Sequence, residues 1–164
     1  MLDLALFLFL TATGAPAKAS PSLPAPDRTA IAILAKAKPS GLAWQYSRRI
    51  DINRDGHADR VFTAQDTDHF YVAVVLGPIT TASASSVVAF RLAQGPQDSF
   101  CGPFESLTPE PLSSPSELLQ VIGAVPEGYR YSAEGKGLSL SSGECDRFHI
   151  FWNHTAATLA WWRL

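Results

Sequence analysis

Hydrophobic and polar positions alternate with a period of two over several short stretches of the chain, which is typical of half-buried β-strands. Between residues 42 and 50, apolar side chains occupy one face, whereas Gln45, Ser47 and Arg49 occupy the other. The run 70–76 is almost entirely apolar, which predicts a central strand that is covered on both faces. Further strands are predicted at 60–64, 87–92, 129–132, 138–141, 147–153 and 158–164.

One stretch near the N-terminus has helical spacing instead. Within residues 28–38, Ile31, Leu34 and Ala35 fall on one helix face, and Asp27 is a suitable N-cap in front of them. The sequence therefore predicts an α+β fold, in which one N-terminal helix packs on a mainly antiparallel β-sheet. The pattern does not fix the order of the strands or whether the sheet curls or becomes sandwich-like.

The segment 95–115 interrupts the strand pattern because it is rich in proline. A proline cannot donate a backbone hydrogen bond, so we predict a long irregular loop here. The following residues, 116–122, fit either a short helix or a strand, and their periodicity does not decide between the two.

The first residues of the chain have the pattern of an export signal. Residues 4–10 form an apolar run that is too short to span a bilayer, and Ala17-Lys18-Ala19 fits a cleavage site. Since no Lys or Arg precedes the apolar run, a buried N-terminal helix remains the alternative. We predict a signal peptide at 1–19, a flexible segment at 20–26 and one globular domain at 27–164, located in the periplasm or outside the cell.

Charge and cysteine content restrict the possible functions of the protein further. The chain carries 13 basic and 15 acidic residues, and the basic ones form no cluster. Nothing therefore supports binding to nucleic acid, and no later run is apolar enough for a transmembrane span. We expect a monomer.

In an exported protein, the two cysteines, Cys101 and Cys145, predict a disulfide, with two buried thiols as the alternative.

The stretch 51–59 has the pattern of a cation-binding loop. Asp51, Asn53 and Asp55 carry side-chain oxygens at every second position, a glycine follows, and Asp59 ends the stretch. Alternate side chains can turn inward around a hard cation such as Ca²⁺, and the glycine permits a sharp turn. The alternative is a turn without metal, in which the side chains hydrogen-bond their own backbone.

The order Asp-x-Asn-x-Asp-Gly-x-x-Asp before a strand resembles the calcium loop of FG-GAP and VCBS-type repeats, and more distantly those of dockerins and EF-hands. These repeat families build propellers from several copies, whereas this chain has one copy, within residues 48–76. The resemblance therefore extends to the loop alone and implies one Ca²⁺ that joins two strands. The implied ligands are the side chains of Asp51, Asn53, Asp55 and Asp59 and the backbone carbonyl of His57.

Large aromatic residues are concentrated near the C-terminus. Phe151, Trp161 and Trp162 are candidates for a platform that binds a sugar ring or a partner protein. Strand alternation places Trp161 and Trp162 on opposite faces. The favoured interpretation is that these side chains belong to the core, as large aromatics of a small domain usually do, and the platform is the alternative.

Catalysis has weaker support, because the four histidines match no compact metal motif and no serine lies in a nucleophile motif. The favoured prediction is an exported module with structural Ca²⁺ that binds an unidentified protein or glycan. One alternative is a disulfide-stabilised inhibitor-like or envelope protein whose loop 95–115 contacts its partner. The other is a small hydrolase that uses His149 or His154 with Glu144 or Asp146.

Overall fold

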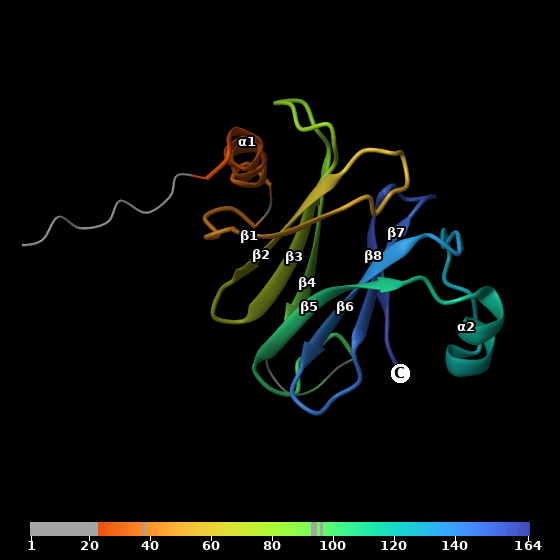
Figure 1. Ribbon diagram of the computed structural model, residues 1–164. Coiled ribbons are helices and arrows are strands. Elements are labelled where there is room, and N and C mark those ends of the chain that lie inside the picture. The colour runs from red at the N-terminus through yellow and green to blue at the C-terminus, as the bar shows by residue number, and fades with distance from the viewer. Residues whose placement is uncertain (1–22, 38, 93–94, 96) are drawn as a thin grey trace, which may run out of the picture.

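Two four-stranded antiparallel sheets lie face to face in this protein, as Figure 1 shows for the computed structural model. The structure describes residues 23–37, 39–92, 95 and 97–164. The first sheet contains β1 (Gln45–Ile50), β2 (Asp59–Gln65), β3 (His69–Val75) and β4 (Ser85–Arg91). The second sheet contains β5 (Phe104–Pro111), β6 (Lys136–Ser142), β7 (Phe148–Asn153) and β8 (Thr158–Trp162). In both sheets, strands adjacent in sequence are adjacent in space.

The predicted α+β fold, one helix on one sheet, is therefore wrong. Two helices are present among the described residues, α1 (Ala25–Leu34) and α2 (Pro115–Ile122), and both are short. The pattern of alternation identified most strands, but it contains no information on which strands are hydrogen-bonded to each other. Dividing the strands between two sheets requires contacts between residues far apart in the sequence.

The segment 95–115 contains the strand that completes the second sheet. Strand β5 pairs with β6 along its whole length, although it includes Pro109 and Pro111. A proline is tolerated there because β5 is an edge strand, whose outward side needs no donor. The predicted long loop is thus wrong for 104–111, and the strand predicted at 129–132 is not formed.

The main core lies between the two sheets and is rich in aromatic rings. The ring centroids of Phe90 and Phe148 are 4.5 Å apart, so this pair bridges the two sheets. Phe100 lies beside both rings, and Trp161 contacts both from β8. Because all three phenylalanines are almost fully buried, they fix the spacing of the sandwich.

A second, smaller core forms where α1 covers the outer face of the first sheet (Figure 1). Val72 and Val74 of β3 face the main core, while Ala73 and Val75 face this smaller core. Strand β3 is thus covered on both faces, as its apolar run predicted. Helix α1 begins earlier than expected, and Asp27 is not its cap but lies inside its first turn.

Helix α2 and the disulfide both belong to connections of the second sheet. Helix α2 resolves the open alternative at 116–122 in favour of a helix, and Ser114 caps it by accepting a hydrogen bond from the backbone N–H of Glu117. The predicted disulfide between Cys101 and Cys145 is confirmed; it joins the segment before β5 to the β6–β7 turn. None of the described helices has the length and apolar character needed to cross a membrane.

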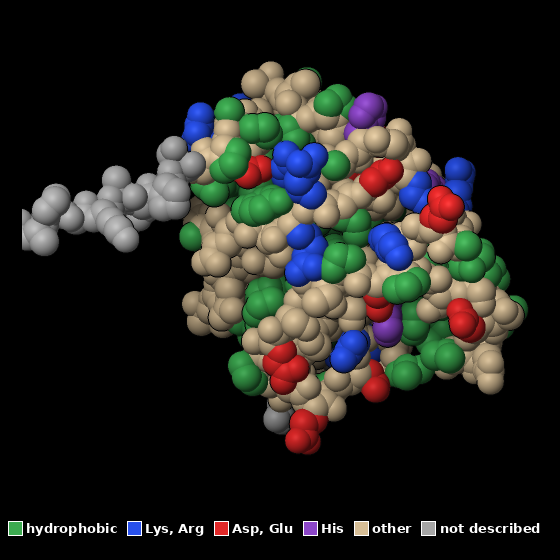
Figure 2. All heavy atoms as spheres, in the orientation of Figure 1, with side chains coloured by type: hydrophobic (Ala, Val, Ile, Leu, Met, Phe, Trp, Pro, Cys, Tyr) green, Lys and Arg blue, Asp and Glu red, His purple; other side chains and the backbone are tan. Residues whose placement is uncertain are grey.

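The N-terminal predictions lie mostly outside the part of the chain that the structure describes. This holds for the signal peptide at 1–19 and for residues 20–22 of the segment predicted to be flexible. Of the rest of that segment, residues 25 and 26 already belong to α1. On the face seen in Figure 2, basic and acidic side chains are interspersed, and neither sign forms a continuous patch.

Candidate calcium loop and the outer face of the second sheet

The stretch 51–59 forms the connection between β1 and β2, and its acidic side chains turn towards one backbone segment. Asp51 accepts hydrogen bonds from the backbone N–H of Asp55 at 3.1 Å and of Gly56 at 3.0 Å. Asn53 Oδ1 accepts from the same Asp55 N–H, and Asp55 Oδ1 accepts from the N–H of His57 at 2.8 Å. The oxygens of these three side chains therefore accept hydrogen bonds from the backbone of residues 55–57, as the alternative of a turn without metal predicts.

Two residues of the loop adopt a left-handed backbone conformation. Gly56 has φ +87°, which matches the sharp turn predicted from its glycine. Arg54 has φ +60°, which is uncommon for a residue with a side chain and was not predicted. Its guanidinium contacts the second sheet, where it donates to the carbonyl of Tyr131 at 3.4 Å and to Nε2 of His154 at 3.2 Å.

Asp59 differs from the other acidic residues of the loop because its side chain is fully buried. One carboxylate oxygen accepts from the backbone N–H of Ile52 and the other from the N–H of Gly77, both at 2.9 Å. Burial raises the pKa of Asp59, and these two hydrogen bonds oppose the rise. The carboxylate thus ties the start of the loop to the chain just after β3.

Gly77 allows two backbone segments to approach each other closely at this junction, which the sequence pattern did not predict. A Cβ added at Gly77 would lie 2.6 Å from the carbonyl oxygen of Ala58, so a side chain would collide with the loop. Nothing in the sequence pattern explains a glycine at this position. Its reason is the close approach of two backbone segments.

The chemistry of the loop suits a hard cation, although the acidic groups are not gathered into one cluster. The available donors are carboxylate and amide oxygens, which Ca²⁺ prefers. The amide of Asn53 and the N–H of His57 hydrogen-bond Asp55 and lower the pKa of its carboxyl group, so this residue is ionised at neutral pH. Among the described residues, however, no three His, Cys, Asp or Glu side chains converge closely enough to hold a metal.

The candidate aromatic platform is divided between the two faces of the second sheet. Trp161 points inward and packs on the main core. Phe151 points outward but is only 3 % exposed, because Tyr129 covers it with a ring centroid 5.0 Å away. Trp162 also points outward and is partly exposed. Of the three candidates, Trp162 is therefore the one accessible from the outer face.

Trp162 forms a planar stack with a histidine on that outer face. The rings of Trp162 and His149 are 3.9 Å apart and inclined by 12°. Nδ1 of His149 lies 2.8 Å from a carboxylate oxygen of Glu110, on β5. Glu110 and His149 reach each other across β6, because the β6 residues opposite them, Gly137 and Ser139, are small. The sequence did not predict this partner, because β5 itself was not recognised.

The residues considered for a hydrolase are not brought together. His149 pairs with Glu110, and His154 hydrogen-bonds Arg54. Neither histidine forms a hydrogen bond or ion pair with Glu144 or Asp146 in the described part of the chain, since these two acids lie in the β6–β7 turn beside the disulfide.

Comparison with protein-family models, with curated proteins and with solved structures finds no match to this chain. The functional argument therefore starts from the loop and from the outer face of the second sheet.

Proposed function

We propose that this protein is an exported binding module in which the loop 51–59 holds a structural Ca²⁺. The observation that carries the proposal is the common orientation of Asp51, Asn53 and Asp55 towards residues 55–57. These side chains supply oxygen ligands, and His57 adds its backbone carbonyl. As for the other three side chains, the oxygens of Asp59 already accept backbone N–H groups and would be shared with the ion.

The position of the loop gives the ion its structural role. The loop joins β1 to β2, contacts Gly77 after β3 through Asp59, and contacts the second sheet through Arg54. A cation there offsets the repulsion between Asp51 and Asp55 and orders all of these connections. With the affinities usual for extracellular modules, about 1 mM Ca²⁺ would raise the free energy of unfolding by about 0.4–1.4 kcal/mol.

The test is thermal unfolding of the protein in EGTA and in Ca²⁺, combined with calorimetric titration of Ca²⁺. We expect Ca²⁺ to raise the Tm of the wild type and to have no effect on Asp55→Ala. Asp68→Ala is the matched control, because it removes an exposed carboxylate outside the loop. If the wild type shows neither a shift in Tm nor binding heat, the loop is a metal-free turn and this part of the proposal fails.

The interaction role is assigned to the outer face of the second sheet, towards an unidentified glycan or protein. What supports it is the partly exposed Trp162, which His149 and Glu110 hold in a fixed orientation. A preorganised aromatic ring beside polar groups suits a sugar ring or an amphipathic side chain. The disulfide and the pattern of residues 1–19 support export.

This role is tested by titrating a panel of soluble oligosaccharides while following tryptophan fluorescence and binding heat. A glycan that binds the wild type should lose affinity for Trp162→Ala and keep it for Tyr131→Ala, which removes another exposed aromatic residue. Equal affinity for the wild type and Trp162→Ala would remove this face from the proposal. If no glycan binds, a glycan role is excluded and the proposal is reduced to a protein partner.

A further inference from the structure

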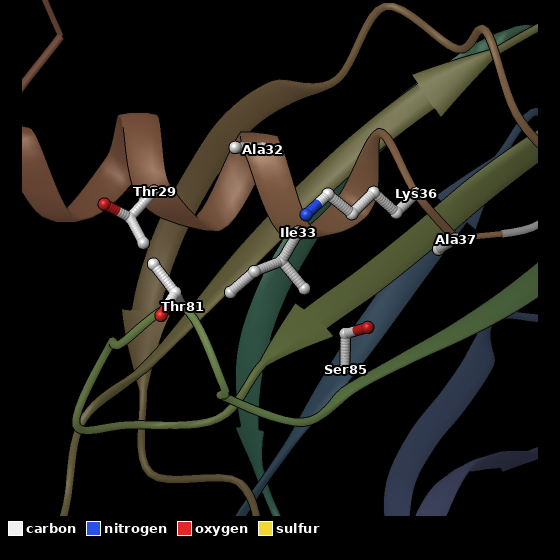
Figure 3. A pocket seen from close by; sticks show the side chains of 7 residues that line it. All are labelled: Thr29, Ala32, Ile33, Lys36, Ala37, Thr81 and Ser85. Atoms are coloured by element: carbon white, nitrogen blue, oxygen red, sulfur yellow. The ribbon is translucent and has the colours of Figure 1, made fainter.

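A groove of about 350 Å³ lies between α1 and the chain that connects β3 to β4, as Figure 3 shows. Ala32, Ile33 and Ala37 form its apolar part. Polar side chains stand around them from both walls: Thr29 and Lys36 on the helix side, and Thr81 and Ser85 on the opposite side. Its volume falls in the range of natural small-molecule sites, although at the lower end.

Both walls of the groove are fixed by contacts of their own. The turn before β4 is held by Ser83, whose hydroxyl donates to the carbonyl of Pro78 and accepts from the N–H of Thr80. Helix α1 is anchored by the ion pair between Asp27 and Arg60, which are 2.7 Å apart and largely buried. The groove is therefore preformed, so a ligand need not order either wall.

The polar groups of the groove differ in whether they are already engaged. The hydroxyl of Thr29 donates to the carbonyl of Ala25 at 3.2 Å and serves the helix. Within the described residues, Lys36, Thr81 and Ser85 have no side-chain hydrogen bond, and Lys36 has no ion pair. Figure 3 shows the Lys36 side chain extending back along the helix, and Lys36 and Ile33 both line the groove. The groove thus combines the positive charge of Lys36, which has no counter-charge among the described residues, with an apolar surface.

We propose that this groove binds a small monocarboxylate with a short apolar chain. The carboxylate pairs with Lys36, the only charged side chain among the described residues that line the groove, and accepts hydrogen bonds from Ser85 or Thr81. The apolar chain covers Ile33, Ala32 and Ala37. An anion is selected over a neutral molecule of the same shape because only the anion neutralises Lys36. This site is separate from the loop 51–59 and does not depend on Ca²⁺.

The proposal is tested by NMR titration of the ¹⁵N-labelled protein with sodium hexanoate and with hexanamide, which has the same shape but no charge. Hexanoate should cause saturable shifts at residues 29–37 and 81–85. Hexanamide should bind about five- to tenfold more weakly, as expected for the loss of one charge-assisted hydrogen bond in an open site. The variant Lys36→Gln should lower the affinity for hexanoate to that for hexanamide.

Two further variants make the result decisive. Lys136→Gln removes an exposed lysine in β6 and should leave hexanoate binding unchanged. Ala32→Phe fills the groove from the exposed side of α1 and should abolish the shifts, while the Tm shows whether the variant is folded. The proposal is overturned if hexanoate gives no saturable shifts, if the shifts lie elsewhere, or if hexanoate and hexanamide bind equally well.

Discussion

Arg54 in the first sheet's β1–β2 loop donates a hydrogen bond to Nε2 of His154 in the β7–β8 turn of the second sheet, over 3.2 Å. A guanidinium is always protonated, so Nε2 must be the acceptor and the imidazole must be neutral. Burial lowers the pKa of His154, and the charges of Arg54 and Arg130 lower it further. This contact joins the two sheets, and protonation of His154 opposes it.

The first prediction concerns pH. The pKa of His154 is lower in the folded state than its ordinary value of 6.5, so the unfolded chain binds the proton more readily. Stability should therefore decrease as the pH falls below about 6.5 and continue to decrease down to the lowered pKa. We expect His154→Gln to lose this component of the pH dependence, as measured by Tm between neutral pH and pH 5. His69→Gln is the control. If His154→Gln follows the wild-type profile, His154 does not titrate in this way.

The second prediction separates the backbone of Arg54 from its side chain. Both Arg54→Ala and Arg54→Gly lose the contacts to Tyr131 and His154, but only glycine relieves the positive φ. We expect both variants to be less stable than the wild type, and Arg54→Gly to be more stable than Arg54→Ala by about 1 kcal/mol. Denaturant unfolding at neutral pH measures both differences. An alanine variant as stable as the glycine variant would show that φ is not constrained at this position.

The third prediction concerns the junction at Gly77. In Gly77→Ala, the new methyl group would lie 2.6 Å from the carbonyl of Ala58, so one of the two segments must move. That movement also disturbs the hydrogen bond from the Gly77 N–H to Asp59. We expect a loss of about 1–3 kcal/mol in denaturant unfolding, as for other overpacked sites. Ala82→Gly, at an exposed position of the next turn, should change stability far less, and a stable Gly77→Ala would show that the loop yields easily.

Several features could be predicted because they depend on neighbours in the sequence. The alternation of β8 placed Trp161 and Trp162 on opposite faces, and the structure confirms this. The apolar run at β3 correctly indicated a strand that is covered on both sides. The disulfide between Cys101 and Cys145 followed from the number of cysteines together with the export pattern at the N-terminus. In each case, local pattern or composition was sufficient.

The features that were missed depend on contacts between distant residues. Strand β5 was hidden by Pro109 and Pro111, which are acceptable only because β6 is the sole neighbour of β5 in the sheet. Without β5, the pairing of Glu110 with His149 could not be foreseen. The contacts of the Arg54 guanidinium with Tyr131 and His154 likewise join residues that are far apart in the sequence. A single sequence contains no direct record of such contacts.

The order of the strands divides the chain into two consecutive halves. All strands of the first sheet precede residue 92 and all strands of the second follow residue 103, so the polypeptide passes between the sheets once. Cys101 lies at the end of the crossing segment and Cys145 lies in the second half, so their bridge does not fasten one sheet to the other. A proteolytic nick between β4 and Cys101 would divide the chain into two fragments with no covalent link, and each strand would stay in the same fragment as the strands it pairs with. The contacts between the two sheets, among them the packing of Phe90 on Phe148, would then hold the fragments together as a non-covalent complex.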